Sequence, residues 1–122
     1  MRKAVRYPDE EFVVWGSGEQ YRDFVFVDDA VEALVLVLER GVGRGVIQIG
    51  SERAVTLREA AAVIVAASGK RIPVRFDPSK PEGDRGRIAI CKRAHDILGW
   101  QPQTDFELGI KYTYRWIEQQ LM

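Results

Sequence analysis

The sequence predicts an α/β fold for a single domain formed by residues 1–122. Segments with strand character and segments with helix character alternate four times along the chain, which is typical of α/β proteins. Residues 46–49 precede a helical segment that can serve as a crossover, so parallel strand pairs are expected. One expected helix, residues 28–40, is apolar around most of its circumference, which predicts that it is covered on more than one side.

The expected strands are short apolar runs rich in β-branched and aromatic residues. They are residues 12–15, 23–27, 46–49 and 73–76. The sequence Gly16-Ser17-Gly18 predicts a turn after the first of them. A polar loop with two prolines and two glycines follows the last strand, over residues 77–86, and residues 87–91 form a further extended segment.

The expected helices carry recognisable signals at their ends. They are residues 2–7, 28–40, 57–68, 92–98 and about 105–121. Asp28 and Asp29 are expected to cap the second helix, and Gly41 to end it. Capping boxes, in which a threonine and a glutamate three residues later bond each other's backbone, open two more helices. They are Thr56 with Glu59 and Thr104 with Glu107.

Composition excludes several classes of function. Eighteen basic residues balance eighteen acidic ones, and a net charge of zero argues against nucleic acid as the main partner. A single cysteine, Cys91, and a single histidine, His95, exclude a disulfide framework and a multi-thiolate or multi-histidine metal site. The longest apolar run, residues 33–38, is far shorter than the roughly 20 residues of a membrane span. With no signal peptide expected at residues 1–3, the prediction is a cytoplasmic protein.

Four local patterns, in this order and at this spacing, resemble a known family. They are WGSGEQYRDFVFVDDAVEAL (15–34), VIQIGSERAVTLREAAAVI (46–64), PEGDRGR (81–87) and LGWQPQTDFELGIKYTYRWI (98–117). Together they resemble the C-terminal, substrate-binding part of NAD-dependent nucleotide-sugar epimerases and dehydratases, which are extended short-chain dehydrogenase/reductases. The resemblance covers about residues 3–120, and among these enzymes it is greatest to the GDP-mannose 3,5-epimerases.

Two motifs of the complete enzymes are missing from these 122 residues. The family begins with a glycine-rich fingerprint that binds the dinucleotide, whereas the glycines at 16 and 18 precede a strand instead of a helix. The family also carries a catalytic Tyr-x-x-x-Lys pair, and none of the four tyrosines has a lysine four residues later. The resemblance therefore implies no cofactor in this chain, since the N-terminal Rossmann half that binds NAD in a complete enzyme is absent. It also implies no catalytic residues and no activity of the chain alone.

Arg22 is the first candidate for substrate binding. It lies between a glycine-rich turn and an expected strand, where a guanidinium can bind a diphosphate through two nitrogens. The alternative is a surface arginine paired with Asp23 or Glu19. In the family that the chain resembles, the matching arginine contacts the phosphates of the sugar nucleotide.

Five other residues complete the expected substrate site. Trp15, Gly16 and Gln20 belong to the same turn, where the resemblance implies contact with the base, although Trp15 could equally be a core residue. The resemblance also places one arginine of the PEGDRGR loop on the diphosphate, with Arg87 preferred over Arg85. The alternative for this loop is a solvated segment without a binding role.

The sequence departs from the family pattern just after this loop. An aspartate expected about eight residues before Leu98 is replaced by Ile90 or Cys91, and the serine or threonine that follows it is replaced by Lys92. The resemblance therefore does not fix the local geometry of the site at these positions. Cys91 is expected to be a small buried residue instead of a nucleophile, and His95 a solvated helix residue.

The predicted function is binding of a nucleoside-diphosphate sugar as part of an epimerase or dehydratase. The apolar helix predicts that the chain forms a homo-oligomer or binds a Rossmann-domain partner. Two alternatives are a complementing subunit and a non-enzymatic self-associating protein that keeps only the scaffold. A further alternative is that the chain is a piece of a longer protein.

Overall fold

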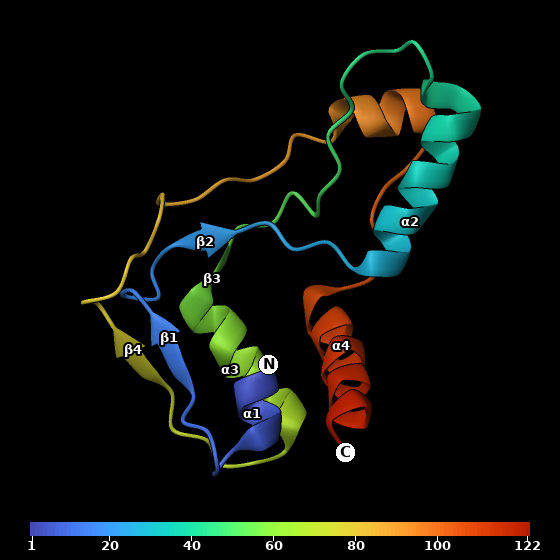
Figure 1. Ribbon diagram of the computed structural model, residues 1–122. Coiled ribbons are helices and arrows are strands. Elements are labelled where there is room, and N and C mark those ends of the chain that lie inside the picture. The colour runs from blue at the N-terminus through green and yellow to red at the C-terminus, as the bar shows by residue number, and fades with distance from the viewer.

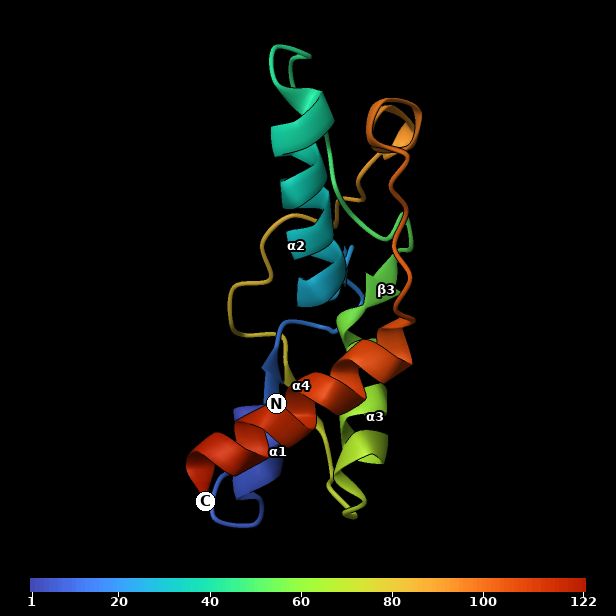
Figure 2. The same ribbon diagram turned by 90° about the vertical axis from the view of Figure 1, so that its right-hand side faces the viewer.

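The computed structural model describes all 122 residues, which form a lower body and an upper arm (Figures 1 and 2). The body contains α1 (Arg2–Arg6), β1 (Val13–Trp15), α3 (Leu57–Ser68), β4 (Arg75–Asp77) and α4 (Phe106–Leu121). The arm contains α2 (Val27–Leu36), which continues as the π-helical turn η1 (Val37–Gly41), and a second π-helical turn, η2 (Ala94–Leu98). Between them lie β2 (Tyr21–Arg22) and β3 (Val55–Thr56).

Two small sheets confirm the α/β class, and one of them is a parallel pair, although residues 46–49, on which that expectation rested, take no part in it. β1 and β4 run parallel, with Val14 opposite Phe76. β2 and β3 run antiparallel, with Tyr21 opposite Thr56. The polypeptide between β1 and β4 includes α3, so the parallel pair is joined across a long connection as its geometry requires.

Two predicted strands, residues 23–27 and 46–49, are wrong. Residues 23–26 and 46–49 have no regular structure, and Val27 already belongs to α2. A strand exists only where a neighbouring backbone completes its hydrogen bonds, and neither segment pairs with any strand of this chain. Val46 is 83% exposed, whereas Ile47 and Ile49 are half-buried and pack against buried residues of the arm without forming a strand.

The N-terminus of α2 also differs from its prediction. Phe26 precedes the helix, and Asp28 and Asp29 lie in its first turn without capping it. The carboxylate of Asp29 instead accepts a hydrogen bond from the backbone N–H of Thr104, at 2.9 Å. Asp29 is buried and joins α2 to the chain that leads into α4, so its charge serves a tertiary contact.

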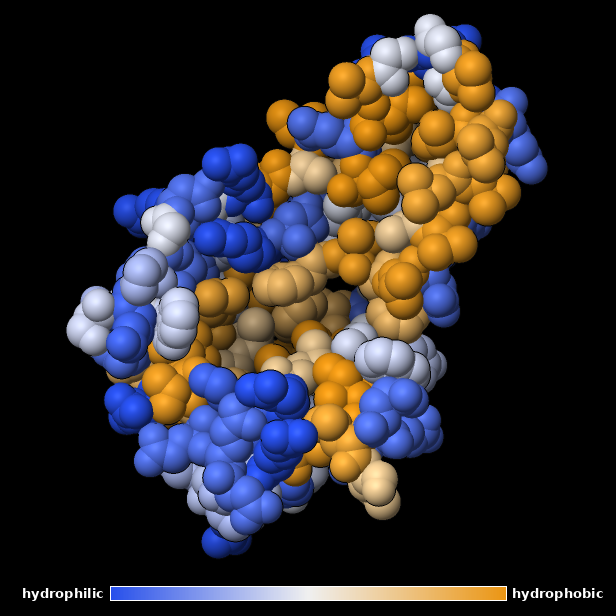
Figure 3. Space-filling view, viewed as in Figure 1, coloured by the Kyte–Doolittle hydropathy of each residue, from blue (hydrophilic) through white to orange (hydrophobic).

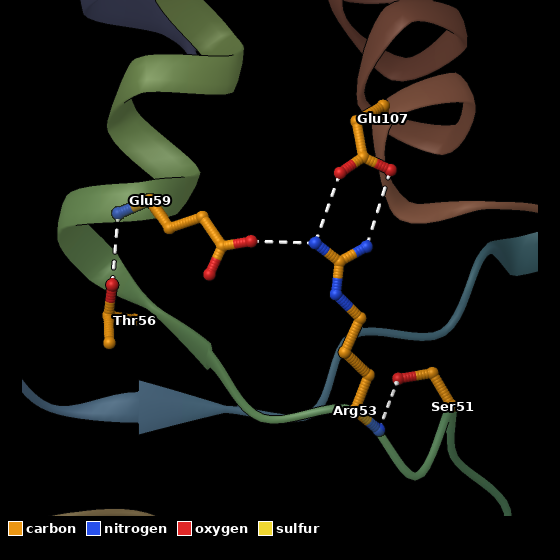
Figure 4. Close-up of polar contacts among 5 residues, drawn as sticks. All are labelled: Ser51, Arg53, Thr56, Glu59 and Glu107. Carbon is orange, nitrogen blue, oxygen red and sulfur yellow. Dashed lines mark hydrogen bonds and ion pairs between the residues drawn. The ribbon is translucent and has the colours of Figure 1, made fainter.

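One of the two predicted capping boxes is confirmed in part. Thr56 accepts a hydrogen bond from the N–H of Glu59 at 3.0 Å and opens α3. The box of Thr104 and Glu107 is wrong, because α4 begins after Asp105 and no side chain caps it. The carboxylate of Glu107 turns to the guanidinium of Arg53 instead (Figure 4).

Two hydrophobic clusters correspond to the body and the arm. The cluster of the body joins α1, α3 and α4 through five buried residues: Ala4, Phe12, Ala61, Ile72 and Tyr114. The cluster of the arm packs η2 against α2 through Ala33, Cys91, Ala94, Leu98 and Trp100. The indole N–H of Trp100 donates to the backbone oxygen of Asp29 at 2.9 Å, which satisfies its polar atom inside the cluster.

The outer face of α2 is an apolar surface that the chain itself leaves uncovered, so the predicted cover on more than one side does not come from these 122 residues. Val31 and Leu34 of α2 are 51% and 62% exposed, and Leu38 of η1, which continues this face, is 76% exposed. Figure 3 shows the apolar surface continuing along the arm toward a hollow beside α4. An apolar groove of about 530 Å³ lies between the start of α2 and α4, lined by Val25, Phe26, Val27, Thr113 and Trp116. No helix is long and apolar enough to cross a membrane.

Candidate functional site

The turn at residues 16–20 and the loop at residues 82–87, which are far apart in the sequence, meet at β2. The backbone N–H of Tyr21 donates to the oxygen of Arg85 at 2.9 Å, and Tyr21 forms a parallel bridge with Gly86. A side chain at Gly86 would come within 2.5 Å of the Tyr21 ring, so only glycine allows this approach. The contact places the loop that carries Arg85 and Arg87 beside the strand that carries Arg22.

Glu82 joins the turn to the loop. Its two carboxylate oxygens accept hydrogen bonds from the backbone N–H and the hydroxyl of Ser17, both at 2.9 Å. These bonds to the backbone and side chain of Ser17 lower the pKa of the Glu82 carboxyl. Gly16 has a φ of +85°, and a side chain there would strike Glu82 and Gln20. The glycine therefore lets Glu82 and Gln20 lie directly against the turn. Sequence analysis did not identify Glu82 as a residue that holds this turn.

Gln20 is buried at 2% exposure and carries an unused hydrogen-bond acceptor. Its amide nitrogen donates to the backbone oxygen of Trp15 at 3.1 Å, whereas its amide oxygen has no partner in the protein. Gln20 and Arg85 line a polar cavity of about 340 Å³ together with Glu19, Glu82 and Gly83. Trp15 itself is 56% exposed, so its interpretation as a core residue is wrong.

Arg22 and Arg87 meet on one carboxylate, that of Asp84. Arg22 Nη2 lies 3.3 Å from Asp84 Oδ1, and Arg87 Nε lies 2.6 Å from Asp84 Oδ2. Arg22 also donates to the backbone oxygens of Tyr21 and Asp84, at 2.7 and 3.3 Å. The expected alternative partners of Arg22 were wrong, because Glu19 pairs with Arg58 and the carboxylate of Asp23 is engaged elsewhere.

Asp23 fixes the backbone on both sides of the site. Its carboxylate accepts hydrogen bonds from the N–H and hydroxyl of Ser51, both at 2.6 Å, and from the N–H groups of Glu52 and Ala89 at 3.2 and 2.9 Å. Burial raises the pKa of this carboxyl, but these hydrogen bonds outweigh burial and lower it below its ordinary value. Ala89 follows the loop that carries Arg85 and Arg87, so Asp23 anchors the end of that loop.

Arg58 adds a fourth cation beside the turn, which sequence analysis did not single out. It pairs with Glu19 at 2.9 Å and donates to the backbone oxygen of Ser17 at 2.7 Å. Its guanidinium carbon lies 4.1 Å from the centre of the Phe76 ring, a cation–π contact that positions the side chain. Arg58 therefore adds a positive charge beside Glu19, which lines the polar cavity with Arg85.

Comparisons with known proteins identify the relationship. The model of the NAD dependent epimerase/dehydratase family matches residues 1–50. GDP-mannose 3,5-epimerase 1 of Oryza sativa subsp. indica is 37% identical over 120 residues, which are 98% of this chain and 31% of that protein. The chain is homologous to the C-terminal part of these NAD-dependent epimerases and dehydratases. GDP-L-fucose synthase 1 of Arabidopsis thaliana, a second relative, is 36% identical over 107 residues.

The fold agrees with that of solved epimerases. The structure of UDP-glucose 4-epimerase from Thermotoga maritima with UDP-glucose matches 99% of this chain, with a TM-score of 0.89 and 31% identity. The match takes up 38% of the length of that epimerase. The chain spans about a third of the length of the curated epimerases and synthases that it matches. Its α/β fold is thus the C-terminal portion of an extended dehydrogenase/reductase, as predicted.

Residues 90–92, which depart from the pattern of the epimerase/dehydratase family, are held by other contacts. The backbone N–H groups of Ile90 and Cys91 donate to the side chains of Gln48 and Glu52, at 2.9 and 2.8 Å. Lys92 forms an ion pair with Asp96. The position of the missing aspartate is therefore ordered without it.

Cys91 and His95 have the roles that sequence analysis expected. Cys91 is 4% exposed, and its sulfur lies 3.5 Å from the backbone oxygen of Gly50. Burial raises its pKa, which opposes formation of a nucleophilic thiolate. The His95 ring is exposed on the outside of η2, beside Asp96.

Proposed function

We propose that these 122 residues form the part of an NAD-dependent epimerase or dehydratase that binds a nucleoside-diphosphate sugar. The observation that carries this proposal is the convergence of Arg22 and Arg87 on a single carboxylate. Two guanidinium groups that share one anion in this way can share a diphosphate, because carboxylate and phosphate present similar oxygens to an arginine. The likeness to an epimerase solved with UDP-glucose supports the same ligand class.

The remaining residues of the site have complementary roles in this proposal. The unpartnered amide oxygen of Gln20 accepts a hydrogen bond from the base or the sugar, since a buried acceptor gains most from such a donor. The exposed indole of Trp15 offers a face for stacking beside Gly16. Arg85 lines the polar cavity apart from the arginine pair, and we assign it to a second contact with the ligand.

The residues present do not fit a nicotinamide dinucleotide. Pyrophosphate binding by a glycine-rich turn needs free backbone N–H groups at the start of a helix. The turn at residues 16–18 leads into β2, and the N–H of Ser17 is already bonded to Glu82. We therefore assign no hydride-transfer step to these residues and expect no turnover from them alone.

Calorimetric titration of the purified chain tests the proposal. The ligands are GDP, UDP, dTDP, their mannose and glucose conjugates, and NAD. We expect binding of one nucleotide group and none of NAD. Arg22→Ala should weaken that binding about tenfold or more, because a charge-assisted contact to phosphate is lost. Arg75→Ala removes another arginine that forms an ion pair, with Glu11 on a more exposed part of the surface, and is the control that should leave binding unchanged.

Two results would overturn the proposal. One is the absence of binding by a sample whose circular dichroism shows a folded chain. The other is binding that Arg22→Ala leaves unchanged, since the ligand would then occupy another part of the surface.

The α2 face supports a second proposal, that the chain acts in an assembly. Its exposed apolar side chains form a surface that a monomer rarely leaves in water, and segments 23–26 and 46–49 have backbone that pairs with no strand. We infer that a second copy of the chain, or a Rossmann domain that binds the dinucleotide, covers it. We also propose a cytoplasmic location, which a single unpaired cysteine favours.

A further inference from the structure

We propose that Asp84 is an internal competitor for the phosphate-binding arginines and sets the affinity of the site for its ligand. This inference rests on the proposed function, because it names the group that the ligand must displace. The carboxylate of Asp84 uses one oxygen for Arg22 and the other for Arg87. It therefore occupies the position at which a bound phosphate would meet both guanidinium groups.

The loop around Asp84 is anchored on both sides, whereas Asp84 itself is held by arginines. On one side Glu82 is bonded to Ser17, and on the other the oxygen of Arg85 accepts from Tyr21. Between these anchors, Gly83 has a φ of +77°. The Asp84 side chain is 45% exposed, so it can turn into solvent while the anchors stay in place.

Competition follows from charge and geometry together. Nη1 of Arg22 donates to the backbone oxygens of Tyr21 and Asp84, at 2.7 and 3.3 Å, and Nη2 lies 3.3 Å from the Asp84 carboxylate. A phosphate that approaches the pair is repelled by the carboxylate until the carboxylate leaves. Both ion pairs are exposed to solvent, so each is weak and can be exchanged for a ligand with more negative charge.

Titration of the chain with inorganic pyrophosphate tests this role without depending on a base or a sugar. The proteins are the wild type, Asp84→Asn and Asp84→Ala. We expect both variants to bind pyrophosphate about fivefold more tightly than the wild type. This gain corresponds to the combined energy of the two exposed ion pairs, which the ligand no longer has to break. The gain should shrink in high salt, because salt screens the exposed pairs. Glu11→Gln removes the acid of another exposed ion pair and should leave the affinity unchanged.

The outcomes separate this inference from the proposed function. Equal or weaker pyrophosphate binding by the Asp84 variants would overturn the inference, because Asp84 would then organise the arginines instead of competing for them. The proposed function would still stand if the wild type bound a nucleoside diphosphate through Arg22. If the variants bound pyrophosphate more tightly but no protein bound a nucleotide, the competitor role of Asp84 would be supported and the proposed function would be overturned. The absence of pyrophosphate binding by all three proteins would overturn the inference.

Discussion

At the scale of single residues, Asp23 organises the candidate site without belonging to the arginine pair. One carboxylate accepts four hydrogen bonds from the segments around Ser51 and Ala89. A carboxylate suits this position because all of its partners are donors. An amide of the same shape offers only one accepting oxygen and turns an N–H group toward other N–H groups.

Asp23→Asn should lower the free energy of unfolding by about 1.5 kcal/mol at pH 7. This value is the lower end of the range for the contribution of a hydrogen bond to a charged group. Because folding lowers the pKa of Asp23, its contribution is complete above the ordinary value of 3.8 and is lost as the pH falls through the folded-state pKa. Urea denaturation of both proteins between pH 7 and pH 2.5 measures the difference. A difference that did not shrink in acid would contradict this role for the carboxylate.

Some residues of the site could be predicted from the sequence and others could not. Arg22 and Gln20 lie in one short motif, so local pattern and family resemblance were enough to select them. Glu82 and Asp84 are 65 and 62 residues from their partners Ser17 and Arg22. No pattern within a short stretch of sequence predicts contacts over such separations. The role of Arg58 could not be predicted for the same reason, because its contacts to Glu19 and Ser17 join distant parts of the chain.

At the scale of elements, Arg53 joins the N-termini of α3 and α4 (Figure 4). Its guanidinium donates to Glu59 at 2.6 Å and to both oxygens of Glu107 at 3.1 and 3.3 Å. The backbone N–H of Arg53 donates to the hydroxyl of Ser51, which in turn bonds Asp23. The two helices are thereby connected to the backbone that supports the site.

Arg53→Met should lower the melting temperature at pH 7, because methionine keeps part of the apolar stem and removes both ion pairs. The hydrogen bond from Arg53 lowers the pKa of Glu107, so this contribution is present above the ordinary value of 4.5 and is lost as the pH falls through the folded-state pKa. Thermal melts at pH 7 and pH 3 compare the wild type, Arg53→Met and Arg53→Lys. The lysine variant should be intermediate at pH 7. Melting temperatures that differ equally at both pH values would show that Arg53 acts through packing alone.

The helices could be predicted better than the strands, for a physical reason. A helix completes most of its hydrogen bonds within its own segment, so α3 follows from the pattern of residues 57–68 and the cap at Thr56. A strand needs a partner, and residues 46–49 have none in this chain. The sequence pattern of this segment is that of a buried strand, but the neighbouring backbone that would make it one is not among these 122 residues.

At the scale of the whole molecule, the body is packed and the arm is only half covered. The outward residues of α2 remain exposed, and the apolar surface continues to the groove beside α4 (Figure 3). The relatives have about three times the length of this chain. The uncovered side of α2 is therefore the side on which a larger assembly would gain most from burial.

The double change Leu34→Glu and Leu38→Glu should reduce self-association without unfolding the chain, because both side chains are mostly exposed. Light scattering should give the wild type a mass above 13.9 kDa and shift the variant toward that mass. Glu32→Gln changes a charged residue of the same helix and should leave the mass as in the wild type. A wild-type chain that stays folded at 13.9 kDa over the accessible concentrations would contradict self-association.

The central claim is that a nucleoside-diphosphate sugar binds between the turn at residues 15–22 and the loop at residues 82–87. The most direct measurement is a titration of the ¹⁵N-labelled chain with GDP-mannose, followed by ¹H–¹⁵N correlation spectra. We predict that the largest shift changes fall on backbone and arginine side-chain signals of these two segments. Changes confined to the groove beside α4, or no change at millimolar ligand in a well-dispersed spectrum, would contradict the claim.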